Sequence, residues 1–163
     1  MEIISKILGS QARVKIMRLF LLNKTKGFKN AEVGKRSRVP ANVVRRELRL
    51  LNSIDFIKKK SSSSSEWCFD PSFKYAPELE DFLINADSLD NEAILNNFKN
   101  AGKPKLVVVS GVFIKNKDSR VDLLVVGDKL KRGKIDEGVH KLEAEIGSEL
   151  VYAVFDTKEF IYR

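Results

Sequence analysis

Cysteine and histidine are nearly absent from the sequence, with one residue of each among 163. Cys68 has no second cysteine for an internal disulfide, and together with His140 it supplies too few ligands for a metal cluster of the cysteine and histidine type. We interpret Cys68 as a small core residue and His140 as a surface residue. Neither a metal nor another cofactor is expected.

Long hydrophobic runs are absent as well. Apolar stretches such as 106–109 are far shorter than the roughly 20 residues that cross a bilayer. The first residues include an early acid, Glu2, with no charged leader and no small-residue cleavage site, which argues against a signal peptide. We therefore expect a cytoplasmic protein without membrane contact. Its 43% of hydrophobic residues are enough for one core or two small ones.

Acidic residues are scarce only in the first half of the chain. Residues 1–75 hold 17 Lys and Arg against 6 Asp and Glu, whereas residues 76–163 hold 13 against 16. The net charge of +8 therefore originates in the first half. Such an asymmetry is expected when one domain binds a polyanion and the other does not. A uniformly solvated basic surface gives no reason for the basicity to end near residue 75.

Hydrophobic periodicity predicts four helices in the first half: a short terminal helix within 3–8, a central helix over 11–22, a short basic helix over 30–37, and a fourth that starts at Val39-Pro40. In the fourth helix Val44, Leu48 and Leu51 form the buried row. The helical wheel places four polar side chains on the opposite face, Asn42, Arg46, Arg49 and Ser53, with Arg45 beside them. A strand, a serine loop and a second strand follow, and the first arm of this hairpin carries Lys58, Lys59 and Lys60.

This order of helices and hairpin is that of a winged helix-turn-helix domain. The segments 9–20 (GSQARVKIMRLF) and 44–51 (VRRELRLL) resemble prokaryotic winged-helix transcriptional regulators of the ArsR-like kind, and the resemblance extends over about residues 5–75. It implies that the basic helix reads the major groove of duplex DNA and that the hairpin is the wing. It also implies a homodimer on two half-sites.

In that interpretation Arg45, Arg46 and Arg49 contact guanine edges or phosphates, with Asn42 and Ser53 as shorter-range partners. The lysines of the wing mostly bind phosphate. For each arginine the alternative is a solvated helix face. The apolar residues of the terminal helix either form part of the dimer interface or cap the core of the monomer, and these are Ile3, Ile4, Ile7 and Leu8.

The second half follows a different pattern. Residues 76–102 hold two helical segments and are interpreted as a helical connection. Beyond them, strands are predicted over 106–109 with an extension to Ile114, over 121–126 and over 150–155, with a helix over 135–146. This alternation predicts a small α/β domain with a mixed sheet over 103–163, and an α+β protein as a whole.

The segments 107–113 (VVVSGVF) and 118–128 (DSRVDLLVVGD) resemble the minimal nucleotidyltransferase domain. In that family a Gly-Ser turn cradles the nucleotide phosphates and an Asp-x-Asp pair on the next strand holds Mg²⁺. Here Val112 follows Gly111 in place of the serine, and Arg120 stands in place of the first acid, before Asp122. Because an arginine disfavours a divalent cation beside it, we expect no metal and no catalysis.

The sequence thus predicts a DNA-binding transcriptional regulator with a catalytically inactive nucleotidyltransferase-like domain that binds a partner or a ligand. Three alternatives stay open. The first is an active nucleotidyltransferase with a displaced metal site, in which Asp118 or Asp156 supplies an acid. The second is an antitoxin-like protein that binds a protein partner through residues 103–163. The third is a nucleotide sensor in which Arg120 or Lys115 contacts a phosphate.

Overall fold

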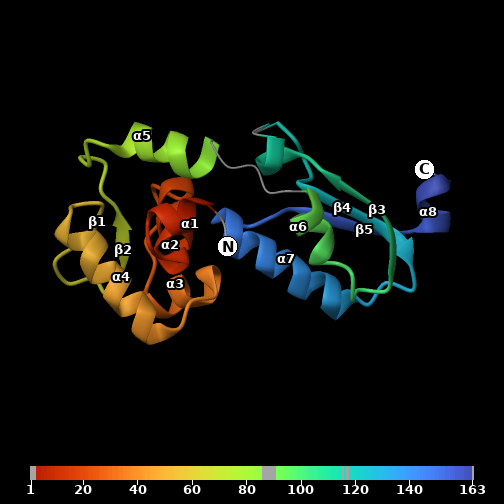
Figure 1. Cartoon of the computed structure of the whole chain (residues 1–163), viewed down its shortest axis with the longest axis horizontal. Helices are drawn as coiled ribbons and strands as arrows, with labels where there is room; N and C mark the ends of the chain where they lie inside the picture. Colours follow the sequence, from red (N-terminus) through yellow and green to blue (C-terminus); the bar gives the residue numbers. More distant parts are fainter. Residues whose placement is uncertain (1–2, 86–90, 115, 117, 163) are drawn as a thin grey trace. The chain divides into compact units, whose positions relative to one another are not determined.

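A computed structural model describes residues 3–85, 91–114, 116 and 118–162 of the chain. The chain forms two compact units. Unit 1 comprises Met1–Asp87 with Glu143–Ser148, and unit 2 comprises Ser88–Leu142 with Glu149–Arg163. Helices and small sheets occur in both units, so the protein is α+β (Figure 1). In the described part of the chain no helix is long and apolar enough to cross a membrane.

Unit 1 begins with four helices at the predicted places: α1 (Ile3–Ile7), α2 (Gln11–Leu22), α3 (Asn30–Ser37) and α4 (Ala41–Ser53). Ser10 is the N-cap of α2, because its side chain accepts a hydrogen bond from the backbone N–H of Arg13 at 3.1 Å. Pro40 is the N-cap residue of α4. The turn before it is made by Arg38, which has a left-handed φ of 54°.

A hairpin of β1 (Ile57–Lys59) and β2 (Trp67–Phe69) follows α4, with Lys58 opposite Cys68 in an antiparallel register. The prediction that Cys68 belongs to the core is wrong. Phe69 is the inward-facing residue of β2, and its neighbour Cys68 is only half-buried because successive strand residues face opposite sides.

The core of unit 1 lies between α2, α4 and the hairpin. Phe20, Leu48 and Phe56 are among its fully buried side chains. The chain continues into α5 (Ala76–Glu80) and a π-helical turn, η1 (Asp81–Asn85). Leu83 of η1 is fully buried, and its carbonyl accepts a hydrogen bond from Nε of the buried Arg18 at 2.8 Å. The predicted helical connection therefore starts with elements that belong to the core of unit 1.

Unit 2 is built around one three-stranded sheet. Its elements are α6 (Asn91–Asn96), β3 (Lys103–Val109), the 3₁₀ turn η2 (Gly111–Ile114), β4 (Leu123–Asp128), α7 (Arg132–Ile146), β5 (Tyr152–Asp156) and α8 (Thr157–Ile161). The strand order is β3-β4-β5, with β3 antiparallel and β5 parallel to β4. The sheet is therefore mixed, as predicted.

Helix α7 packs on this sheet through its apolar row. Ile135, Val139 and Leu142 are buried, as are Leu123 and Val125 of β4. The extension of the first strand to Ile114 is a wrong prediction. The chain leaves β3 after Val109 because Gly111 adopts a left-handed φ of +51° and starts the turn η2.

Candidate nucleic-acid interface

The outer face of α4 carries every polar side chain that the helical wheel placed there or beside it. All five are exposed, namely Asn42, Arg45, Arg46, Arg49 and Ser53. The opposite row, Val44, Leu48 and Leu51, is at most 1% exposed. Burial of this row fixes the rotation of the helix about its axis, so the cationic face points away from the core.

Two of the three arginines on this face contact only their own helix. Nε of Arg45 donates to the carbonyl of Ala41 at 3.4 Å, and Nε of Arg49 donates to the carbonyl of Arg45 at 3.3 Å. Both bonds are long and solvent-exposed. Neither side chain has a carboxylate partner among the described residues, so both keep their full charge for an anionic ligand.

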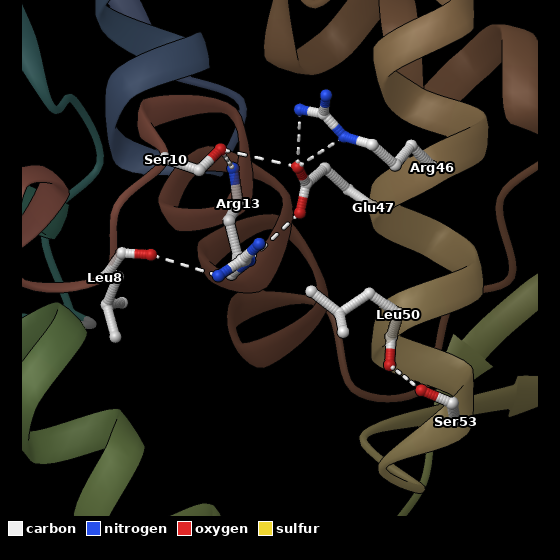
Figure 2. Close-up of polar contacts among 7 residues, drawn as sticks. All are labelled: Leu8, Ser10, Arg13, Arg46, Glu47, Leu50 and Ser53. Atoms are coloured by element: carbon white, nitrogen blue, oxygen red, sulfur yellow. Dashed lines mark hydrogen bonds and ion pairs between the residues drawn. The ribbon is translucent and has the colours of Figure 1, made fainter.

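The third arginine belongs to a cluster that sequence reasoning missed. We call Ser10, Arg13, Arg46 and Glu47 the Glu47 cluster (Figure 2). The carboxylate of Glu47 is only 1% exposed and accepts from Nη2 of Arg46 at 3.0 Å and from Nε of Arg13 at 3.0 Å. Ser10 Oγ lies 3.5 Å from the same carboxylate, and Nη1 of Arg13 donates to the carbonyl of Leu8 at 3.0 Å. The cluster ties the N-terminal turn of α2 to the exposed face of α4.

Each lysine of the hairpin has a partner within unit 1, which the sequence did not indicate. Nζ of Lys58 lies 3.2 Å from Asp70, and Nζ of Lys60 lies 3.2 Å from Glu66. Nζ of Lys59 sits 3.8 Å from the centroid of the Trp67 ring. All three lysines are exposed. Surface pairs of this kind are worth less than about 1 kcal/mol, so a phosphate group can replace the present partners.

The base of the hairpin is fixed against the start of α3. Phe28 and Trp67 exchange two backbone hydrogen bonds, at 2.8 and 2.9 Å, and Nε1 of Trp67 donates to Asn30 Oδ1 at 2.9 Å. Asp70 follows directly after β2, and its pKa lies below the ordinary value. The main cause is the hydrogen bond from the backbone N–H of Ser72, and Lys58 lowers the pKa further. These contacts hold β1 and its lysines in a defined place beside α4.

In unit 2 the carboxylate of Asp122, a residue of the predicted degenerate site, makes structural contacts. The carboxylate of Asp122 accepts from the backbone N–H of Val112 at 2.9 Å and from that of Val151 at 2.8 Å. A Cβ on Gly111 would lie 1.9 Å from Asp122 Oδ1, so only glycine fits there. Asp122 therefore connects the turn after β3 with the residue before β5. The side chain of Arg120 is exposed.

The other acids proposed for a displaced metal site do not join Asp122. Asp156 is the N-cap of α8 and accepts from the N–H of Lys158 at 3.0 Å. Asp118 is exposed. Within the described residues no group of three or more His, Cys, Asp or Glu side chains is placed to hold a metal ion. Lys115, the other residue considered for phosphate contact, lies outside the described residues.

No family model, curated protein or solved structure matches this chain. The two candidate sites are therefore interpreted from their own chemistry. On α4 and the hairpin, exposed cations on rigid elements suit an extended polyanion. At Asp122, each carboxylate oxygen already accepts one backbone N–H group, so the carboxylate has a structural role in the turn.

Proposed function

We propose that unit 1 is a winged helix-turn-helix domain that binds duplex DNA and that the protein is a transcriptional regulator. In this proposal α4 enters the major groove and the β1–β2 hairpin is the wing. The observation that carries it is the exposure of one cationic face of α4 directly before a hairpin with three exposed lysines. An α-helix fits the major groove, and basic side chains flanking it neutralise the phosphates.

The polar side chains divide by what they can recognise. Arg45, Arg49 and the lysines carry charge for phosphate, which gives affinity without sequence preference. Asn42 and Ser53 have short side chains that contact bases or phosphates only where the helix lies close to the DNA. Ser53 Oγ donates to the carbonyl of Leu50 at 2.8 Å, so it acts as an acceptor toward a ligand.

We propose for unit 2 a nucleotidyltransferase-like domain that has lost transfer activity. The engagement of Asp122 by two backbone N–H groups supports this, as does the arginine two residues before it. Such a domain binds a protein partner or a ligand in place of catalysis. A protein partner is favoured by β3, an edge strand on which Leu106 and Val108 are 41% and 42% exposed.

We further propose that the regulator acts as a homodimer. The apolar residues at the start of the chain lie in two environments. Ile4 is buried and Leu8 packs on the core of unit 1, whereas Ile3 and Ile7 are 74% and 64% exposed. The first pair supports the core-capping alternative, and the second pair offers an apolar surface to a second copy. Sedimentation equilibrium at high protein concentration tests this, and a monomer would exclude the dimer.

Selection from a random duplex library tests DNA binding most fully. The protein is immobilised, bound duplexes are recovered at about 100 mM salt, where specific contacts discriminate, and the pool is sequenced after several rounds. We expect one enriched motif, repeated as two half-sites about 10 bp apart if the dimer is correct. Failure to retain duplex DNA even at about 50 mM salt would refute the proposed function.

A further inference from the structure

The Glu47 cluster gives the arginines of α4 unequal chemical environments. Arg46 is 70% exposed, yet Nε at 3.4 Å and Nη2 at 3.0 Å both donate to the 1% exposed carboxylate of Glu47. Arg13 binds the other carboxylate oxygen and is itself held by the carbonyl of Leu8. A buried carboxylate needs such partners, since an unpaired interior charge is unfavourable. The buried acid therefore holds the guanidinium of Arg46 in one direction.

The bonds to Glu47 occupy one edge of that guanidinium and leave another edge available. Nε and Nη2 face the carboxylate, so the Nη1 end of the fork points away from Glu47 (Figure 2), and 70% of the side chain is exposed. A guanine edge presents O6 and N7, which a fixed arginine fork binds in a bidentate manner. A phosphate also accepts a bidentate fork, but it is an anion, so the nearby charge of Glu47 offsets the attraction of Arg46 for phosphate more than for the uncharged guanine edge.

We propose that Glu47 is a positioning residue that directs Arg46 to a guanine edge and thereby sets part of the sequence preference. Arg45 and Arg49, which lack a carboxylate partner in the described part of the chain, supply affinity that does not depend on sequence. The inference rests on the proposed binding of duplex DNA by unit 1. It goes beyond it by assigning different roles to neighbouring arginines.

Two duplexes test the inference: the selected duplex and a duplex of equal length in which the enriched guanines are replaced by adenines. The Kd of the adenine duplex divided by the Kd of the selected duplex measures the preference for guanine. This ratio is measured by fluorescence anisotropy for the wild type, Glu47→Gln, Arg46→Lys and the double variant. Lysine keeps the charge but cannot form the fork. We expect each single substitution to lower the ratio about tenfold. The double variant should show the same loss of about tenfold, because both changes remove the same interaction with guanine.

Arg49→Gln is the matched control on the same helix face. It should weaken binding to both duplexes alike, flatten the plot of log K against log salt by about 0.9, and combine additively with Glu47→Gln. A ratio that either Glu47→Gln or Arg46→Lys leaves unchanged, or that falls about a hundredfold in the double variant, would overturn the inference.

Folding of the variants is followed by the fluorescence of Trp67, the single tryptophan. If Glu47→Gln does not fold, Glu47→Asp replaces it, because aspartate keeps the buried charge but shortens the reach to the exposed Arg46, and the same loss of the ratio is expected. A wild-type protein that binds neither duplex would instead refute the proposed function. The two failures are therefore distinguishable.

Discussion

The contacts of Asp122 predict the effect of removing its carboxylate. Asp122→Ala leaves the backbone N–H groups of Val112 and Val151 without their acceptor. A hydrogen bond to a charged group contributes about 1.5–3 kcal/mol, but water can replace the acceptor at the exposed Val151, so that bond contributes only about 0.5–1 kcal/mol. We expect unit 2 to lose about 2–4 kcal/mol of its free energy of unfolding.

Amide hydrogen exchange measures this loss in unit 2 alone. Amides of β4 and β5 that exchange through unfolding of the unit should exchange about 30 to 700 times faster in Asp122→Ala. The unfolding transition of unit 1, followed by Trp67, should not move. Asp122→Asn should fall between the two proteins, because its amide keeps one acceptor oxygen but turns a donor toward the second N–H.

Two results would refute this account of Asp122. Unchanged exchange in Asp122→Ala would mean that the carboxylate does not hold the turn after β3. The second result is a thermal midpoint that rises with excess Mg²⁺ in the wild type but not in Asp122→Ala. It would mean that Asp122 binds a metal ion, and it would favour the alternative of an active nucleotidyltransferase.

Three further predictions concern unit 1. Leu48→Ala should lower the free energy of unfolding by about 2–5 kcal/mol in urea titrations, since Leu48 is 1% exposed in the core; a decrease below about 1 kcal/mol would contradict that burial. The lowered pKa of Asp70 implies that its carboxylate stabilises the fold above about pH 4 and that this stabilisation is lost as the pH falls further. Asp70→Asn should therefore weaken the pH dependence of acid unfolding followed by Trp67. An unaltered pH dependence would contradict this role of Asp70. Replacing the three hairpin lysines by glutamine should flatten the plot of log K against log salt by up to about 2.7 and weaken binding to all duplexes equally; a selective effect on one sequence would exclude the phosphate role.

The local features of the fold could be predicted from the sequence. Amphipathic spacing located α2, α3 and α4, and the row Val44, Leu48 and Leu51 determined which face of α4 is exposed. These features depend on residues within one helix, where the spacing of apolar side chains alone decides burial.

Features that depend on distant residues could not be predicted. Glu47 lies on an otherwise basic helix, and its burial follows from Arg13, 34 residues earlier in the chain. The partners of the hairpin lysines and the two N–H groups on Asp122 are likewise set by the tertiary fold. The sequence does contain one indication of the Glu47 cluster. Glu47 is the one acid in α4, and a carboxylate among arginines commonly forms charged hydrogen bonds with them.

Salt dependence of DNA binding tests the central claim most directly. The wild type and an Arg45→Gln/Arg49→Gln variant are titrated into a labelled duplex of mixed sequence between about 50 and 200 mM salt. We predict that log K falls linearly with log salt for the wild type and that the slope of the variant is shallower by about 1.8, or about 0.9 for each phosphate that the variant no longer neutralises. Absence of binding by the wild type, or equal slopes for the two proteins, would contradict the assignment of α4 to duplex DNA.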